Sequence, residues 1–387
     1  MENREKDTGG ASAGKASGRN GIMAAMEKKM KTAYLLLEDG TSYKGYAMGA
    51  EGSAVGEVVF NTDMTTYQDL LQDPTYSGQI VVQTYPLIGN RGVDPEAPSK
   101  LMASGYIVRE WCVEPTDAHE FVTLDEYLKQ RGIVGLCGID TRALTRHIRD
   151  HGVMNGVIAE SLDDREGLLA RLEGYRVPPA VGQITVKEPQ RRTLEGAKYR
   201  LAIPDYGFRR SILSHFEEMG CSCTIYPAYT SAAEILADDP DGIVLSDGPG
   251  DPWDNPEIID ILRELMKSGK PLFGWGLGHQ LLAVAGGFRI EKLPVGHRGS
   301  NQPVRNVETF RVMTTEQNHG YAVALDSIDP DRADAFLRNV NDGTVEGIRY
   351  KTIPAMTVQF EPSNGRGYQD TACIFEEFAS MLERVKR

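Results

Sequence analysis

Three polar segments in the second half of the chain hold residue types at a spacing that could do chemistry. They are "SDGPGDP" at residues 246–252, "GWGLGHQ" at 274–280 and "QNHGYAV" at 317–323. In the second segment an apolar strand runs through a tight glycine turn into an apolar-periodic helix, a layout that holds one side chain up at the tip of the turn. The tip residue is Gly276, so this turn has the layout of a nucleophile elbow but carries no nucleophile.

The glycines of "SDGPGDP" follow a predicted buried strand, where bare backbone N–H groups can approach a ligand. The same glycines would be needed for the turn alone if no ligand bound. We interpret "QNHGYAV" as a third polar turn between strands. Together the three segments predict a pocket at the ends of neighbouring strands.

The elements that must position these segments alternate along residues 199–387. Helices separate the apolar runs "YRLAIPDYG", "TIYPAY", "GIVLSDG" and "KPLFGW"; one starts at Ser231 with Glu234 in a capping box, and another at Asn255-Pro256. This order predicts a doubly wound parallel sheet with its ligand crevice at the carboxyl ends of the strands. Later runs, including "AMTVQFEP", are expected to add antiparallel strands.

The preceding sequence divides into three parts. Residues 1–31 are rich in Gly, Ala, Ser and Lys and are interpreted as a disordered tail. Residues 32–180 mix short β-type runs with two helices, near 123–132 and 140–152, without regular alternation. Residues 181–198 have the composition of a linker. A mixed α/β domain is therefore expected before the doubly wound one.

Composition and charge restrict the function classes. The hydrophobic and charged fractions, 41% and 25%, are those of a soluble globular protein. A formal net charge of −13 without a long basic stripe argues against a nucleic-acid or membrane-surface binder, and no apolar run approaches the about 20 residues that span a bilayer. Five scattered cysteines are typical of a reduced, cytosolic protein, and Cys221 and Cys223 are expected to be buried rather than to hold zinc.

In their order, the three segments resemble those of the class I glutamine amidotransferases. The first block narrows the resemblance, since "LEDGTSYKGYAMGAEGSAVGEVVFNTDMTTYQDLLQDPTYSGQIV", "GIDTRALTRHIRDHGVMNGVI" and "DYGFRRSIL" are similar to the carbamoyl-phosphate synthase small subunits. The resemblance covers residues 32–387. It implies an α/β fold in which a mixed α/β N-terminal domain precedes a doubly wound class I amidotransferase-like domain.

The resemblance also implies a division of labour. In this family the small subunit hydrolyses glutamine, and a large partner subunit receives the ammonia and makes carbamoyl phosphate for arginine and pyrimidine synthesis. The expected partner is therefore a carbamoyl-phosphate synthase large subunit, with ATP and Mg on that subunit. No cofactor and no metal are expected in this chain.

Glutamine hydrolysis needs a thiolate, a base held by a third group, and two backbone N–H groups for the oxyanion. By the resemblance, the cysteine position is Gly276, and the histidine and glutamate positions are Glu361 and Ser363. None of the seven histidines follows His319. The sequence therefore predicts that the catalytic triad is absent and the glutaminase lost, with Glu361 a solvated carboxylate.

The binding residues look better preserved. By the resemblance, the oxyanion donors are the backbone N–H groups of Gly248 and Leu277, whereas the large side chains of Trp275 and Phe360 would fill the pocket. Arg298 replaces a histidine of the usual pattern, and His279 and His319 are expected to be structural. The glutamine-binding positions fall on Thr75, Gly248, Gly250, Leu277, Gln280, Asn318, Gly320 and Tyr321.

Three functions follow from these residues. The first is a glutaminase-inactive small subunit that acts as a scaffold for an ammonia-using large subunit. The second is a sensor that binds glutamine without cleaving it. An active amidotransferase with another nucleophile comes last, because Ser300 and Thr75 are the only nearby hydroxyls and neither has an evident base.

Overall fold

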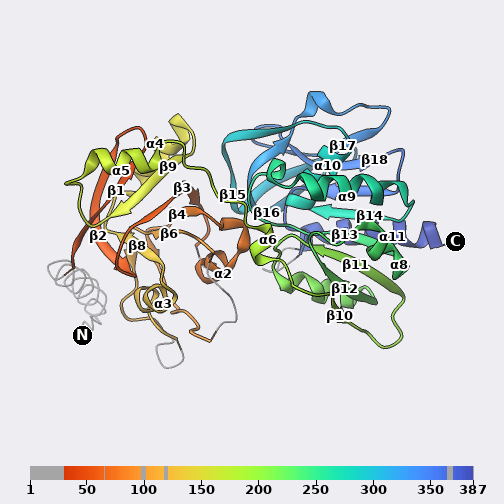
Figure 1. Cartoon of the computed structure of the whole chain (residues 1–387), viewed down its shortest axis with the longest axis horizontal. Coiled ribbons are helices and arrows are strands. Elements are labelled where there is room, and N and C mark those ends of the chain that lie inside the picture. The colour runs from red at the N-terminus through yellow and green to blue at the C-terminus, as the bar shows by residue number, and fades with distance from the viewer. Residues whose placement is uncertain (1–29, 65, 97–101, 117–120, 364–368, 387) are drawn as a thin grey trace, which may run out of the picture.

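The computed structural model describes residues 30–64, 66–96, 102–116, 121–363 and 369–386. The tail predicted at residues 1–31 lies outside this part, except for its last two residues. Figure 1 shows two lobes side by side, a first one with the early strands and a larger one that holds the rest of the chain. The mixed domain and the doubly wound domain predicted from the sequence are both present.

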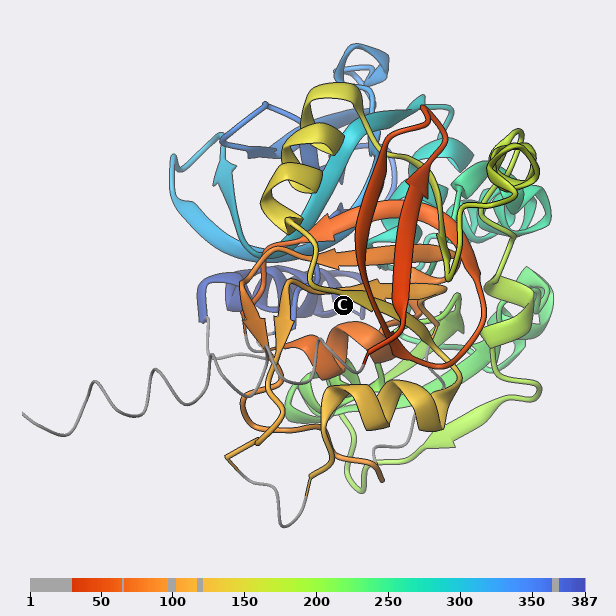
Figure 2. The same ribbon diagram turned by 90° about the vertical axis from the view of Figure 1, so that its left-hand side faces the viewer.

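The first lobe is built on a closed seven-stranded barrel, with the strand order β1-β2-β8-β6-β4-β3-β9 (Figure 2). Because the barrel is closed, it has no free strand edge that could pair with another chain. Open sheets must protect such edges in other ways. The sequence predicted four of these runs as strands but not their closure. The strands are β1 Thr32–Leu37, β2 Ser42–Gly49, β3 Ala54–Asn61, β4 Gln79–Gln83, β6 Gly105–Ile107, β8 Val134–Cys137 and β9 Met154–Ala159.

Strand alternation gives the barrel two apolar layers. Ile80, Val82 and Ile107 pack in one cluster with α4, whereas Val81 and Tyr106 pack with α2 and α3. The capping box predicted at the start of α3 is present. The helices are α2 Tyr67–Gln72, α3 Leu124–Arg131, α4 Thr141–His151 and α5 Arg165–Leu172. Two short strands, β5 Leu87–Ile88 and β7 Glu110–Trp111, pair with each other.

The segment between the lobes is more ordered than its composition indicates. It contains α6 Val181–Ile184 and the edge strand β10 Gln190–Arg192, which pairs antiparallel with β12. Val181 belongs to the core of the second lobe. The expectation of a linker over 181–198 is therefore wrong for these residues, because three-residue strands and single helical turns are too short to give a periodic pattern.

The second lobe is a ten-stranded sheet in the order β10-β12-β11-β13-β14-β19-β18-β17-β15-β16. Strands β12, β11, β13, β14 and β19 run parallel, as doubly wound topology requires. The remaining strands extend the sheet antiparallel. Their bounds are β11 Tyr199–Asp205, β12 Cys221–Pro227, β13 Gly242–Leu245, β14 Leu272–Trp275, β15 Ile290–Asn306, β16 Val312–Val323, β17 Ala333–Asn339, β18 Val345–Tyr350 and β19 Ala355–Val358.

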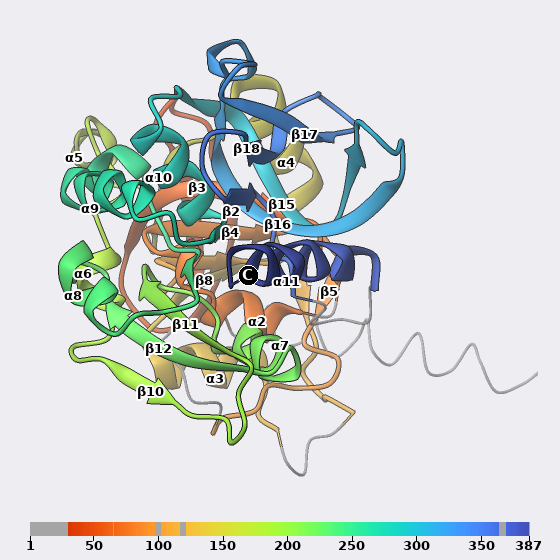
Figure 3. The ribbon, with the colours of Figure 1, turned by 90° about the vertical axis from the view of Figure 1, so that its right-hand side faces the viewer.

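Helices cover both faces of this sheet (Figure 3). Apolar side chains of α8, α9 and α10 enter one core cluster, and those of α7 and α11 enter the other. The capping box of Ser231 and Glu234 is present, whereas Asn255 stands at the N-cap without a side-chain capping bond. The helices are α7 Leu213–Glu218, α8 Ala232–Ala237, α9 Pro256–Lys267, α10 Leu277–Ala285 and α11 Ala372–Lys386.

Two predictions about this lobe are wrong. The run "AMTVQFEP" was expected to be antiparallel, but β19 lies parallel to β14 and antiparallel only to β18. "QNHGYAV" was expected to be a turn, but it lies within β16 and pairs with β15, with His319 opposite His297. Polar side chains on one face of a strand at the edge of a cavity look like a turn when only the sequence is read.

Candidate functional site

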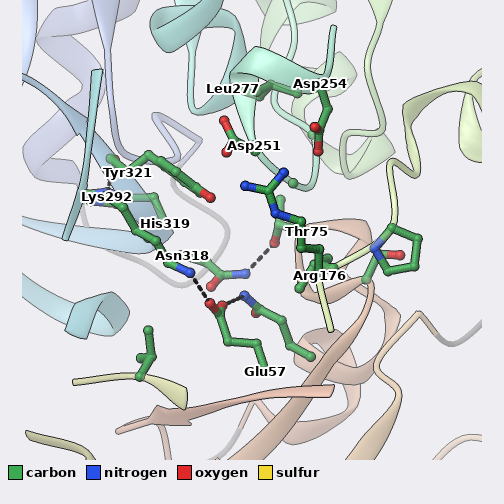
Figure 4. Close-up of a pocket in the computed structure, with 18 of the residues that line it drawn as sticks. Glu57, Thr75, Arg176, Asp251, Asp254, Leu277, Lys292, Asn318, His319 and Tyr321 are labelled. Carbon is green, nitrogen blue, oxygen red and sulfur yellow. Dashed lines mark hydrogen bonds and ion pairs between the residues drawn. The ribbon is translucent and has the colours of Figure 1, made fainter. Parts of the chain in front are cut away.

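A cavity of about 540 Å³ lies between the two lobes at the carboxyl ends of the parallel strands. Glu57 and Thr75 come from the barrel side, and Leu277, Asn318 and Tyr321 from the large sheet and its elbow helix (Figure 4). The structure brings all the predicted glutamine-binding positions to this one cavity. They are Thr75, Gly248, Gly250, Leu277, Gln280, Asn318, Gly320 and Tyr321.

The elbow at the base of the cavity keeps the backbone shape of a nucleophile turn. Gly276 lies between β14 and α10 with φ 54° and ψ −119°, which L side chains rarely adopt. A Cβ atom added there would lie 1.9 Å from Oδ1 of Asp247. The carboxyl group of Asp247 therefore occupies the space that a side chain at position 276 would need.

Asp247 also takes the two donors predicted to hold an oxyanion. The backbone N–H groups of Gly248 and Leu277 donate to its Oδ1 over 2.7 Å and 2.8 Å. Leu277 begins helix α10, whose N-terminus favours a negative charge. The prediction that these two N–H groups remain available is wrong, because a carboxylate from the preceding loop already accepts from both.

The electrostatic surroundings of Asp247 make its charge costly. Burial raises the pKa of this carboxyl well above its ordinary value, the bonds from Leu277 and Gly248 oppose the rise, and the nearby charges of Asp73 and Glu361 add to it. The Asp247 carboxyl therefore binds a proton at a higher pH than an ordinary aspartate does, because it is buried among other carboxyl groups.

Arg209 is the cation of this acidic environment. Its guanidinium lies 2.8 Å from Glu316 and 3.7 Å from both Asp73 and Glu361. Burial opposes its charge, but the three carboxylates outweigh burial and raise the pKa of Arg209. Glu361, expected to be a solvated carboxylate, is instead largely buried, at 9% side-chain exposure, in an ion pair.

The opposite wall of the cavity joins the lobes by polar contacts (Figure 4). The ammonium group of Lys292 lies 2.6 Å from the carboxylate of Glu57. The amide of Asn318 donates to the hydroxyl of Thr75, and that hydroxyl donates to Asp73 over 2.6 Å. Thr75 therefore has a carboxylate beside it, contrary to the prediction, but in the local geometry of a turn.

Comparisons with known proteins assign the chain to a family. The family described as "Carbamoyl-phosphate synthase small chain, CPSase domain" matches residues 35–158, and "Glutamine amidotransferase class-I" matches residues 202–381. The carbamoyl phosphate synthase small chain of Bacillus thuringiensis subsp. konkukian is 44% identical over 356 residues, which cover 91% of this chain and 96% of the relative. This chain belongs to the carbamoyl-phosphate synthase small chain family.

A second relative carries the same name. The small chain of Syntrophotalea carbinolica is 43% identical over 377 residues, covering 92% of this chain and 99% of the relative. A solved glutamine amidotransferase from Thermotoga maritima aligns over 48% of this chain and 84% of its own chain, at 21% identity and a TM-score of 0.36.

No helix in the described ranges is long and apolar enough to cross a membrane.

The triad positions that the resemblance to the small-chain family indicated lie near one another but hold no thiol or imidazole. Gly276 is at the elbow, and Glu361 follows β19. Ser363 is buried, and its backbone N–H donates to Glu361. Among the described residues, the charged side chains around this centre are carboxylates and one guanidinium. This set can bind and transfer protons, but it contains neither a thiol nor an imidazole.

The two large side chains expected to fill the pocket do not line it. Trp275 and Phe360 are fully buried in the core cluster that α7 and α11 cover, and the Trp275 ring contacts Phe208 and Phe273 at centroid distances of 5.7 Å and 6.3 Å. The physical reason is strand alternation, because Trp275 points to the face of β14 opposite α10. The cavity is therefore still open beside them.

Sequence reasoning missed Asp247 and Arg209. Asp247 was visible inside "SDGPGDP", next to the predicted oxyanion donor Gly248, and a carboxylate there is a signal that could have been read. Arg209 gave no such signal, since its partners Asp73, Glu316 and Glu361 are far apart in sequence. His279 is structural as predicted: it is fully buried, and Nδ1 contacts the hydroxyl of Thr357 at 2.7 Å.

Proposed function

We propose that this chain supports carbamoyl phosphate synthesis as a small subunit that does not hydrolyse glutamine. It would pair with a large subunit that carries ATP and Mg and uses free ammonia. Its own work would be structural, holding that partner in an active conformation.

One observation carries this proposal. The carboxyl of Asp247 accepts from both N–H groups of the oxyanion site, and it stands where a side chain on residue 276 would be. A carbonyl oxygen of a substrate cannot accept from the same donors without displacing a carboxylate of the protein. With no thiol and no imidazole at the described centre, the thiolate attack on an amide, and the imidazole that would activate the thiolate, have no residues to perform them.

The same observation favours the scaffold over a glutamine sensor. The walls of the cavity could accept the α-carboxylate and α-amino groups of an amino acid, but the end of the pocket presents Asp247 where the side-chain amide would accept hydrogen bonds. Calorimetry on the isolated chain separates the two functions. Micromolar glutamine binding would favour the sensor, and its absence the scaffold.

The main test is a pull-down of the large subunit followed by an assay of the purified complex. We expect ammonium salts to support carbamoyl phosphate formation and glutamine to add nothing above the ammonia background. Glutamine-dependent turnover above that background would contradict the proposal.

A gain-of-function series sharpens this test. Gly276→Cys alone is expected to stay inactive, because Asp247 still accepts from the two N–H groups and an imidazole is still missing. Asp247→Ala alone frees the two N–H groups and is expected to improve glutamine binding without hydrolysis. Turnover of glutamine by Gly276→Cys alone would show that Asp247 does not block the site.

A further inference from the structure

Three ligand-type side chains meet at the wall of the cavity, away from the elbow. His297 on β15 lies opposite His319 on β16, and Glu346 comes from β18 of the same sheet (Figure 1). One nitrogen of each imidazole and one carboxylate oxygen all lie within 4.8 Å of one another. Glu346 is fully buried, and His319 is 7% exposed on the cavity side (Figure 4).

The hydrogen bonds of Gln317 fix the direction of its amide. Its nitrogen lies 3.0 Å from the hydroxyl of Thr315 and 3.0 Å from the carboxylate of Glu346. The Thr315 hydroxyl uses its own hydrogen on the carbonyl of Gln302, so it can only accept from Gln317. The amide oxygen must therefore face the other way, toward His319, where it lies 3.1 Å from Nε2.

In a neutral His319 ring, the lone pair of Nε2 would then face a lone pair of the Gln317 amide oxygen. Its Nδ1 lies 2.8 Å from the carbonyl oxygen of Tyr321, which can only accept, so Nδ1 carries the hydrogen. In the neutral ring Nε2 is an acceptor, yet it faces the amide oxygen of Gln317. A cation between the two acceptors removes this conflict.

His297 is oriented to contribute a further ligand. Its Nε2 lies 2.8 Å from the carboxylate of Asp342, and Nδ1 lies 3.3 Å from Glu346. Imidazole ligands of metals usually donate their other N–H to a carboxylate or a backbone carbonyl. Asp342 supplies the first kind of partner for His297, and Tyr321 the second kind for His319.

We propose that Nδ1 of His297, Nε2 of His319, the carboxylate of Glu346 and the amide oxygen of Gln317 form a binding site for a divalent cation of the zinc type. In four-coordinate zinc, bonds of about 2.0–2.1 Å place neighbouring ligand atoms about 3.3–3.4 Å apart. Two ligand pairs, at 3.1 Å and 3.3 Å, are already close to this spacing. Two imidazoles with oxygen ligands suit zinc better than calcium or magnesium.

The charges of the neighbouring carboxylates favour a cation. Glu346 and Asp342 bring two negative charges to the group. Bound there, the ion would join β15, β16 and β18 and fix the part of β16 that lines the cavity. The site does not depend on whether the chain hydrolyses glutamine.

The test uses the full-length chain stripped with a chelator and titrated with Co²⁺ as a visible probe, with Zn²⁺ as the competitor. We expect one tight site per chain with the intense visible absorption of four-coordinate Co²⁺, abolished by Zn²⁺. His319→Gln and Glu346→Gln are expected to lose this band. Asp342→Asn, which keeps every ligand, is expected to weaken binding about 10–100-fold.

A surface pair of histidines provides the matched control. His147 and His151 lie one turn apart on α4, with ring centroids 4.4 Å apart, and could take up metal unspecifically. The variant His147→Gln/His151→Gln is expected to keep the band. If His319→Gln does not fold, the wild-type band and the Asp342→Asn affinity still decide the matter. The proposal is overturned if the wild type shows no stoichiometric site, or if its band is lost in the α4 variant and kept in Glu346→Gln.

Discussion

At the scale of single residues, two side chains define the centre of this protein. Asp247 accepts from the backbone N–H groups of Gly248 and Leu277, and Arg209 pairs with the carboxylates of Glu316 and Glu361. Both act through charge placed in a largely buried region, where an unpaired group is costly. Their contributions can therefore be measured as stability.

Gly276→Ala is expected to destabilise the chain by about 1–3 kcal/mol, because its backbone is strained for any L residue and its Cβ would collide with Asp247. Urea unfolding measures the loss. Gly269→Ala is the control, since Gly269 also has a positive φ but open space around it. The added variant Asp247→Ala should recover part of the loss at position 276 and none at 269. Equal losses in both backgrounds would contradict the collision.

Arg209→Met is expected to destabilise the chain by about 3 kcal/mol, the lower end of the range for breaking a buried ion pair. The reason is that Glu316, Asp73 and Glu361 lose their shared cation. Arg263→Met serves as the control, because Arg263 pairs with Asp260 on an exposed helix face and such pairs contribute little. Losses of the same size in chemical denaturation would refute a special role for Arg209.

At the scale of elements, the contact between α10 and β19 contains a titratable group. His279 is fully buried on α10, and burial lowers its pKa to about 3. The unfolded chain binds a proton near pH 6.5 that the folded chain refuses. Stability from this group is thus complete above pH 6.5 and is lost as the pH falls toward 3, at about 1.4 kcal/mol per pH unit.

His279→Gln removes this titration. The variant is expected to be less stable than the wild type at pH 7, and the gap is expected to shrink by about 2 kcal/mol at pH 5. Denaturant unfolding at a series of pH values measures both curves. His151→Gln, at an exposed position, should leave the slope unchanged. A constant gap between wild type and His279→Gln would show that His279 does not drive the acid dependence.

Elements with local signals were predictable from the sequence. The capping boxes at Thr123 and Ser231 and the buried strand Gly242–Leu245 depend on neighbours within a few residues, and the structure has them. Pairings between distant segments were not predictable. The direction of β19 and the strand state of "QNHGYAV" depend on which strands lie beside them. The same holds for the site, since the cavity walls were foreseen but the ion pairs of Arg209 were not.

At the scale of the whole molecule, the border between the lobes lies earlier than the composition indicates. Val181 packs in the core of the second lobe, and the backbone N–H of Ala228 donates to the hydroxyl of Thr185. Strand β10 pairs with β12. The segment predicted as a linker therefore belongs in large part to the second lobe.

Two fragments test this border. A fragment of residues 177–387 is expected to be more stable than one of residues 199–387, because the shorter one lacks α6, β10 and their core contacts. Thermal unfolding followed by circular dichroism compares them. A third fragment, 186–387, keeps β10 but not α6 and should fall between the two. Equal melting temperatures for all three would show that residues 181–198 are a linker, as the composition indicates.

The position of Asp247 also bears on the function that we propose. A thiol introduced at position 276 would meet the Asp247 carboxyl, and an imidazole introduced at position 361 would disrupt the ion cluster of Arg209. Each single substitution thus lowers stability before it adds any chemistry. On the proposed function, a lineage that carries this centre faces a fitness valley on the way to a working triad, so the centre acts as an evolutionary ratchet.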